Sequence, residues 1–352
     1  MVRKKLIAQV AAAGLVAVVA AGCGSDSSGS SDNATITYVG YGGDTQTGQV
    51  TAWQEPFTKD TGTKFQNDTP PDMAKLRAMV ESGNVSWDVI GAAAAEGRKY
   101  CGELFEPLTD ADIDPGVYNG ASKEQIGDCG LPVFEAPAIP FYNTDDFGDN
   151  PPTTIADVFD TKKYPGKRIF LPFVTAGTLE VALLADGVEP DALYPLDIDR
   201  ALAKLDTLGK DAIIPANYGE LQQAMASGNV AMAFSTPSRA SFTIADGAPY
   251  APVWDKVVTS VSIVGIPKGA KNMAAAKKWA SYISKKEPQA RAAEITTLPP
   301  ANSDSQPKYD ELQESLNAYS DEHKGSLVYM DVAWWAENQE EVQTRFTKWQ
   351  VG

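Results

Sequence analysis

Histidine and cysteine are scarce in this sequence, which limits the chemistry that the chain can support. Among 352 residues there are one histidine, His323, and three cysteines. A single histidine excludes most zinc sites and, unless His323 itself took part, a Ser-His-Asp triad. The chain also lacks a Walker-type loop and a GxGxxG motif after a predicted strand. We therefore expect no catalytic residues, no metal and no cofactor, and a binding protein rather than an enzyme.

Basic residues are outnumbered by acidic ones. Lys and Arg number 30 against 46 Asp and Glu, the formal net charge is -16, and no run of Lys or Arg follows residue 5. Such a chain has no basic field to neutralise phosphates, so we expect no nucleic-acid partner. With 43% hydrophobic and 22% charged residues, the composition is that of a globular protein. The length indicates about two domains.

The longest apolar run lies at the start of the chain. Residues 6–19 are apolar apart from Gln9, three basic residues precede them, and small residues follow. About 14 residues are too few to span a bilayer core of about 30 Å as a helix. We therefore interpret residues 1–22 as a secretory signal peptide. Residues 23–33 are rich in Ser, Gly and Asp, which predicts a flexible tether.

Cys23 directly follows the small residues that end this leader. The arrangement resembles the lipobox of bacterial lipoproteins, although Ala20 stands where that motif usually has Leu. The resemblance implies a lipid anchor at Cys23 that holds the exported chain to the outer face of the cytoplasmic membrane. The alternative is a secreted chain with a free Cys23. Lipidation would leave Cys101 and Cys129, and two cysteines in an exported protein predict one disulfide that closes a loop.

Hydrophobic periodicity divides the remaining chain into two α/β units. The first contains predicted strands at 34–40 and 87–91 and helices at 47–59 and 72–82. The second begins near residue 143, with strands at 168–171 and 230–234 and helices at 178–185, 198–208 and 218–227. A strand at 261–266 and helices at 272–285, 309–319 and 334–349 follow. Alternating strands and helices predict mostly parallel sheets, with a binding site in the cleft between the units.

A series of motifs occurs in an order that resembles one protein family. They are YGG at 41–43, EPF at 55–57, TG at 61–62, WDVI at 87–90, YNTD at 142–145, YPGKR at 164–168, the block 177–206, PKGAKN at 267–272 and DVAWW at 331–335. In this order, across residues 35–350, the chain resembles the extracytoplasmic solute-binding proteins of ABC importers, in the polyamine (spermidine and putrescine) group. The resemblance implies a monomer that captures a small amine-containing solute and delivers it unchanged to membrane permease subunits.

The resemblance also implies an α/β fold of the two-lobed periplasmic-binding-protein kind, type II-like, with discontinuous lobes joined by a hinge. Lobe 1 would comprise residues 34–143 and 263–300. Lobe 2 would comprise residues 144–262 and 301–352, including the C-terminal helices. Proteins of this kind close around their ligand by a hinge motion.

A polyamine site needs carboxylates for the ammonium ends and aromatic rings for the methylene chain. The residues that we expect to bind the ligand are Tyr41, Asp44, Glu135, Thr175, Thr178, Thr236, Arg239, Ser262 and Trp334. Packing of the C-terminal helices is the alternative role for Trp334. The chain departs from the polyamine group at residues 92–95, 235–237 and 260–263, where expected polar or aromatic contacts are missing.

Two ligand classes therefore stay open. The first, which we favour, is a polyamine or diamine held by Asp44 and Glu135. The second is a zwitterion such as 4-aminobutyrate, whose carboxylate would meet Arg239 and whose amine would meet Glu135. Outside this family, an exported enzyme and a surface adhesin are the remaining hypotheses.

Overall fold

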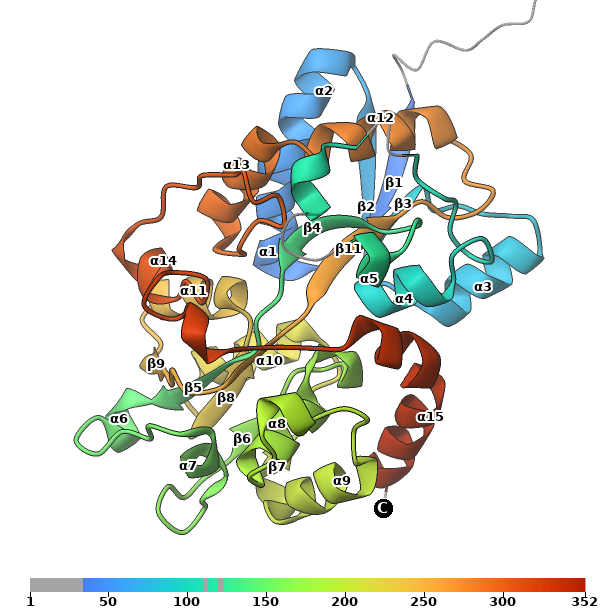
Figure 1. Cartoon of the computed structure of the whole chain (residues 1–352). Coiled ribbons are helices and arrows are strands. Elements are labelled where there is room, and N and C mark those ends of the chain that lie inside the picture. Colours follow the sequence, from blue (N-terminus) through green and yellow to red (C-terminus); the bar gives the residue numbers. More distant parts are fainter. Residues whose placement is uncertain (1–33, 110–112, 119–122, 352) are drawn as a thin grey trace, which may run out of the picture. The chain divides into compact units, whose positions relative to one another are not determined.

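Two five-stranded sheets organise the chain (Figure 1). The computed structural model describes residues 34–109, 113–118 and 123–351. The predicted signal peptide, the tether and Cys23 lie outside these residues. Both sheets are mixed, so the expectation of mostly parallel sheets is wrong for the strands at which the chain crosses between them.

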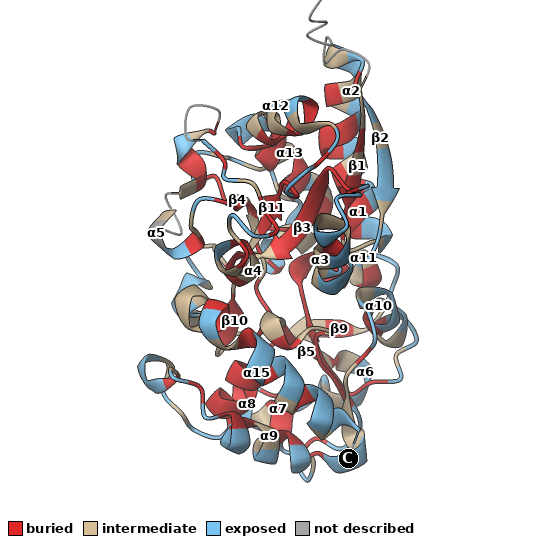
Figure 2. Cartoon of the chain, turned by 90° about the vertical axis from the view of Figure 1, so that its right-hand side faces the viewer, coloured by how far each residue is buried: buried red, intermediate tan, exposed pale blue. Residues whose placement is uncertain are grey.

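The first sheet has the strand order β2-β1-β3-β11-β4. Its strands are β1 (Thr35–Val39), β2 (Lys64–Asp68), β3 (Val89–Ala93), β4 (Leu131–Glu135) and β11 (Val261–Gly265). β2 and β3 run parallel to β1, whereas β11 is antiparallel to β3 and β4. Successive side chains of a strand point to opposite faces of the sheet, and in this sheet both faces carry apolar side chains. Val89 joins one core cluster and Ile90 joins another, so both faces of this sheet are buried (Figure 2).

Helices cover both faces of the first sheet. On one face, buried side chains come from the π-helical turn Val50–Gln54, α2 (Glu55–Thr61), α12 (Met273–Ile283) and α13 (Lys286–Thr296). On the other face they come from α3 (Met73–Glu81), α4 (Ala94–Lys99) and α5 (Lys123–Ile126). The sulfurs of Cys101, just after α4, and Cys129, just before β4, are 2.03 Å apart as a disulfide.

The WDVI and PKGAKN motifs meet at one buried carboxylate. Asp88 accepts hydrogen bonds from the backbone N–H of Thr37 at 2.9 Å and from the backbone N–H of Asn272 at 2.9 Å. The Asn272 side-chain amide donates a third bond at 3.0 Å. Because these bonds satisfy a buried charge and tie β1 and β3 to the start of α12, both motifs serve the architecture rather than the ligand.

The second sheet has the strand order β7-β6-β8-β5-β9. Its strands are β5 (Ile139–Asn143), β6 (Arg168–Ile169), β7 (Ala212–Ile213), β8 (Met232–Ser235) and β9 (Tyr250–Pro252). The helices of this part are α6 (Thr144–Phe147), α7 (Ile155–Phe159), α8 (Thr178–Ala185), α9 (Ile198–Asp206), α10 (Tyr218–Ala226) and α11 (Pro237–Ala245). In its core, Phe170 and Phe234 stack with ring centroids 5.0 Å apart.

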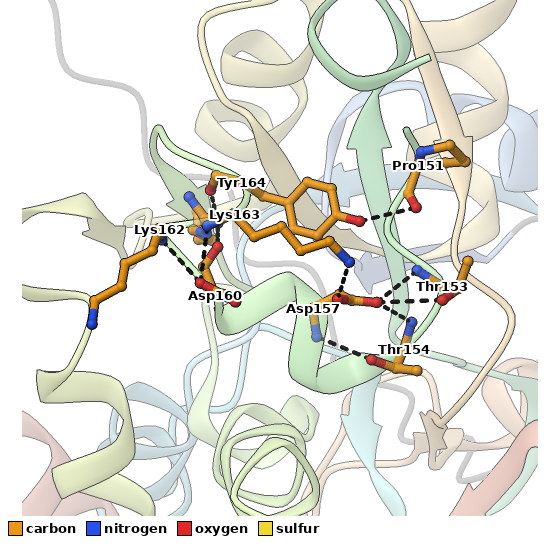
Figure 3. A network of polar contacts seen from close by, with 9 residues as sticks. Pro151, Thr153, Thr154, Asp157, Asp160, Lys162, Lys163 and Tyr164 are labelled. Carbon is orange, nitrogen blue, oxygen red and sulfur yellow. Dashed lines mark hydrogen bonds and ion pairs between the residues drawn. The ribbon is translucent and has the colours of Figure 1, made fainter. Parts of the chain in front are cut away.

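A polar network fixes the start of α7 and the loop that follows it (Figure 3). Asp157 accepts hydrogen bonds from the backbone N–H groups of Thr153 and Thr154 and pairs with Lys163 at 3.0 Å. The Tyr164 hydroxyl donates to the Pro151 carbonyl at 3.0 Å. Partial burial alone would raise the pKa of Asp157, but these hydrogen bonds lower it to about 2. The network includes Tyr164, the first residue of the YPGKR motif.

The chain crosses between the sheets at two adjacent segments. Residues 136–138 lead from β4 to β5, and residue 260 separates β10 (Val257–Thr259) from β11. The two segments are hydrogen-bonded to each other, from Ala136 N–H to the Ser260 carbonyl at 2.8 Å and from Ala138 N–H to the Val258 carbonyl at 2.7 Å. The two lobes are therefore connected by two neighbouring chain segments that are hydrogen-bonded to each other.

These crossings differ from the predicted boundaries at residues 143 and 262. β5 already pairs with β8 and β9 of the second sheet, whereas Ser262 pairs with Ala93 in the first. Both β4 and β5 are apolar, so hydrophobic pattern alone does not reveal where the chain changes sheets. We place lobe 1 at residues 34–135 and 261 to about 305, because Asn302 still bonds to Ser284 and Gln289 beside α12 and α13.

The buried apolar side chains of the C-terminal segment join the core of the second lobe, while its last helix also lies along α4 of the first lobe. It contains α14 (Glu311–Ser315), shorter than the predicted helix at 309–319, then β12 (Leu327–Tyr329) and α15 (Val332–Gln350). β12 pairs with β10 in a separate two-stranded sheet. α15 contacts α9 and also α4 of the first lobe, where Glu340 and Lys99 form an ion pair at 3.3 Å. No helix of the described residues is long and apolar enough to cross a membrane.

Candidate ligand-binding site

A cavity of about 100 Å³ lies between the two lobes. First-lobe residues in its lining include Tyr41, Gln46 and Glu96, and second-lobe residues include Thr175, Tyr218 and Arg239. Several of these residues follow the carboxyl ends of strands, where open α/β sheets usually hold ligands. The volume is below the roughly 300 to 1,000 Å³ of sites for drug-sized molecules, so the cavity suits a smaller solute.

Arg239 brings a buried positive charge to this cavity. It lies in the first turn of α11, and only 2% of the residue is exposed. Its guanidinium donates to the Gly42 carbonyl at 2.8 Å, the Tyr41 carbonyl at 3.3 Å and the Gln222 side-chain oxygen at 3.4 Å. Burial lowers the pKa of Arg239, but a guanidinium stays charged at physiological pH. Within the described part of the chain no carboxylate forms an ion pair with it, so it can receive an anionic group of a ligand.

The YGG motif creates the turn that receives this guanidinium. Gly42 and Gly43 have φ angles of 71° and 62°, in the left-handed region that favours glycine. The turn starts α1 (Gly43–Gln49) and presents the Tyr41 and Gly42 carbonyls to Arg239. A Cβ atom at Gly43 would collide with the guanidinium. The motif therefore belongs to the contact between the lobes as well as to the cavity.

Glu96 brings the opposite charge from the first lobe. It lies in the first turn of α4, and one carboxylate oxygen, Oε2, accepts a hydrogen bond from the Ala93 N–H at 2.9 Å. Burial raises the pKa of Glu96, and the hydrogen bond from Ala93 opposes that shift. Glu96 and Arg239 are the two charged residues among the described residues that line the cavity, and no ion pair joins them.

Aromatic rings from both lobes form one wall of the cavity. Tyr41 contacts Phe173 and Tyr218 edge-on, with ring centroids 5.8 and 5.9 Å apart. The Arg239 guanidinium carbon lies 5.2 Å from the centroid of the Tyr218 ring. Such rings can cover a short methylene chain and attract an ammonium group to their faces.

Five of the nine predicted ligand-binding residues line this cavity. Tyr41 follows β1, Thr175 lies between β6 and α8, Thr236 and Arg239 lie at the start of α11, and Ser262 lies in β11. The fold thus brings together at one cavity residues that are far apart in the sequence.

Asp44 and Glu135, the two predicted carboxylates, lie outside the cavity lining. Asp44 is exposed and accepts a hydrogen bond from the Gln222 side chain of the other lobe at 2.7 Å. Glu135 is buried at the end of β4 and accepts a hydrogen bond from the Tyr319 hydroxyl at 3.0 Å. Phe134, its neighbour, lines the cavity instead, because successive side chains of a strand point to opposite faces.

Thr178 and Trp334 also lie outside the lining. Thr178 is buried at the start of α8. Trp334 packs against Tyr194 and Trp335, with centroid distances of 5.5 Å to each ring, which is the packing alternative. Glu180, in the first turn of α8, is fully buried and accepts hydrogen bonds from Tyr194 and Trp335. These residues organise the attachment of α15.

Sequence reasoning missed Glu96. The alanines at 92–95 suggested that polar contacts after Asp88 had been lost, but the next residue, Glu96, supplies a carboxylate from the first turn of α4. The available signal was a lone acid placed one helical turn beyond a buried strand. No group of three or more His, Cys, Asp or Glu side chains suited to a metal ion occurs among the residues that the structure describes.

The fold and the interlobe cavity define a solute-binding protein of the two-lobed class. The chain belongs to the family of bacterial extracellular solute-binding proteins, whose family model matches residues 52–318. The resemblance found in the sequence is confirmed at this level, as is the two-lobed fold. The chain is therefore the solute-binding component of an ABC importer, an exported class that binds small ligands and delivers them to permeases.

Three similar proteins extend this result. The gamma-aminobutyric acid-binding protein of Pseudomonas aeruginosa is 29% identical over 326 residues, which cover 90% of each chain. The solved Atu4243-GABA receptor is 33% identical, with a TM-score of 0.78 over 90% of this chain and 97% of that one. AgtB of A. tumefaciens R10, solved with agropinic acid, is 27% identical, with a TM-score of 0.81 over 91% of this chain and 99% of that one.

Proposed function

We propose that this chain captures a small zwitterionic amino acid of the 4-aminobutyrate type for import. The observation that carries the proposal is the buried Arg239 guanidinium, which reaches the cavity with only neutral hydrogen-bond acceptors around it. A solute carboxylate can accept from such a group in a charge-assisted, bidentate geometry. The relatives named for GABA support this reading, which is the second of the two ligand classes left open by the sequence.

The polyamine reading that we favoured from the sequence has less support. It depended on Asp44 and Glu135 as partners for two ammonium groups, and neither lines the cavity. One carboxylate, Glu96, is available among the described lining residues, while Arg239 would repel a dication. A molecule with one charge of each sign matches these groups better.

Calorimetric titration of the mature protein tests the proposal. We expect 4-aminobutyrate to bind and putrescine and spermidine to give no heat of binding. Arg239→Gln should weaken 4-aminobutyrate binding by about 10- to 100-fold, since a hydrogen bond to a charged group contributes about 1.5 to 3 kcal/mol. The matched control is Arg200→Gln, at an exposed arginine that pairs with Asp186 and does not line the cavity; this variant should bind normally. Binding of putrescine or spermidine in preference to 4-aminobutyrate would refute the proposal.

We infer further that export uses residues 1–22 and that Cys23 carries the lipid anchor, so that a monomer delivers its solute at the membrane surface. The support is the basic, apolar and small-residue order of the leader and the extracellular character of the family. Cys23→Ser should move the protein from the membrane fraction to the soluble exported fraction and abolish labelling by a fatty acid. Retention at the membrane without label would contradict the anchor.

A further inference from the structure

The cavity holds one carboxylate that the sequence did not identify as a ligand residue. Glu96 lines the cavity from the first lobe, and Arg239 lines it from the second. The aromatic rings of Tyr41 and Tyr218 line the same cavity as these two charged groups. The Tyr41 ring contacts Tyr218, and the Arg239 guanidinium lies over the Tyr218 ring. Opposite charges thus border one apolar surface.

Only one of the two carboxylate oxygens of Glu96 accepts a hydrogen bond within the described part of the fold. Oε2 accepts from the Ala93 N–H at the start of α4, as an acid in the first turn of a helix commonly does. No other hydrogen bond from the described residues reaches this carboxylate, although the group stands in a small cavity. A partly desolvated carboxylate without further donors is stabilised by a cationic partner.

We propose that Glu96 binds the ammonium group of the solute and makes the site selective for carboxylates that carry a distal amine. This inference rests on the proposed function and names the second recognition group of the same site. Arg239 would hold the carboxylate, Tyr41 and Tyr218 would flank the methylene chain, and Glu96 would accept from the ammonium at the other end. Binding therefore joins a charge from each lobe through one molecule, which couples recognition to lobe closure.

The other acids near the lobe boundary are already engaged outside the cavity. Glu135 accepts from Tyr319, and Asp44 accepts from Gln222 at the surface. Neither belongs to the cavity lining, whereas Glu96 does. The role that the sequence assigned to Glu135 in the zwitterion hypothesis therefore passes to Glu96.

A ligand-by-variant titration tests this assignment. 4-Aminobutyrate and butyrate, which lacks the amine, are titrated into the wild-type mature protein, Glu96→Gln and the control Glu135→Gln. Gln at position 96 keeps a side-chain oxygen for the Ala93 N–H, so α4 retains its hydrogen bond, and a thermal melt checks the fold. Wild type and Glu135→Gln should prefer 4-aminobutyrate over butyrate by at least about 10-fold. In Glu96→Gln the affinity for 4-aminobutyrate should fall by about 10- to 100-fold, while that for butyrate stays unchanged or rises.

The outcomes separate this inference from the proposed function. If the wild type binds 4-aminobutyrate and Glu96→Gln keeps the full preference over butyrate, Glu96 is not the amine partner but the proposed function stands. Equal losses for both ligands in a folded Glu96→Gln protein would show a structural role only and would also overturn the assignment. If the wild type binds no carboxylated amine at all, the proposed function itself fails.

Discussion

At the scale of single residues, burial raises the pKa of three glutamates that form no ion pair with the described residues, Glu96, Glu135 and Glu180. Glu135 shows this effect at the crossover between the lobes, where 6% of the residue is exposed. Burial raises the pKa of Glu135 from an ordinary value of 4.5 to about 7, and the Tyr319 hydrogen bond only partly opposes the shift. The folded chain thus holds a proton on Glu135 in a pH range in which the unfolded chain has released it.

The sign of the resulting pH dependence follows from linkage. A group whose pKa is higher in the folded state stabilises the fold below its unfolded pKa, and that contribution disappears as the pH rises through about 7. Glu135→Gln removes the titration, so the variant should gain stability relative to wild type between pH 5 and pH 8, by at most about 3 kcal/mol. Urea denaturation across this range measures the difference. The exposed Glu322→Gln is the control, and a pH-independent difference for Glu135→Gln would contradict the interpretation.

At the scale of elements, α15 makes two hydrogen bonds from an indole N–H to a carboxylate, one buried and one at the surface. The indole N–H of Trp335, a residue that is 1% exposed, donates to Glu180 at 2.7 Å. The indole N–H of Trp349, near the other end of the helix, donates to Asp206 at 2.7 Å at the surface. Losing a donor to a buried carboxyl costs more than losing one where water can replace it.

This contrast predicts unequal effects of two matched substitutions. Trp335→Phe should lower the free energy of unfolding by about 1 to 3 kcal/mol, because Glu180 loses one of its two donors. Trp349→Phe should lower it by less than about 1 kcal/mol, since water replaces its bond. Urea denaturation of the two variants beside wild type gives both values. Equal losses would mean that the Trp335–Glu180 bond adds nothing beyond ring packing.

At the scale of the whole molecule, direct hydrogen bonds join the lobes beside the cavity. Thr45 and Ser238 share one at 2.7 Å, Gln222 donates to Asp44 at 2.7 Å, and Arg239 donates to the Gly42 carbonyl at 2.8 Å. All of them connect α1 or the turn before it with α10 and α11. These contacts can form only while the lobes lie together, so they favour the closed arrangement and a slow release of solute.

The double variant Asp44→Ala, Ser238→Ala tests this contribution without touching a charged group in the cavity. Removing two bonds made only in the closed state should raise the Kd for 4-aminobutyrate by about 10-fold and leave its preference over butyrate unchanged. In X-ray scattering, ligand should reduce the radius of gyration of both proteins, with the variant needing more ligand. Thr47→Ala, at an exposed position on α1, is the control. An unaltered Kd in the double variant would show that these bonds do not favour closure.

Much of the architecture and part of the site could be predicted from the sequence, because they depend on residue type and local order. The apolar alternation of residues 34–40 predicts β1, and Asp72 with Gly83 correctly delimits α3. Arg239 could be proposed for a solute carboxylate because it closely follows a predicted strand. The positions of the two crossings could not be found in this way, since β4, β5 and β11 are apolar on either side of them.

The order of short motifs along the chain was enough to indicate the family, because it depends on residue type and spacing alone. Which acid enters the cavity depends on the three-dimensional fold. On β4, a shift of one residue separates Phe134, which faces the cavity, from Glu135, which faces Tyr319. Glu96 reaches the cavity because β3 ends beside β1 and β11 and α4 starts there. Side-chain direction and strand neighbours are set by long-range packing, which local sequence does not encode.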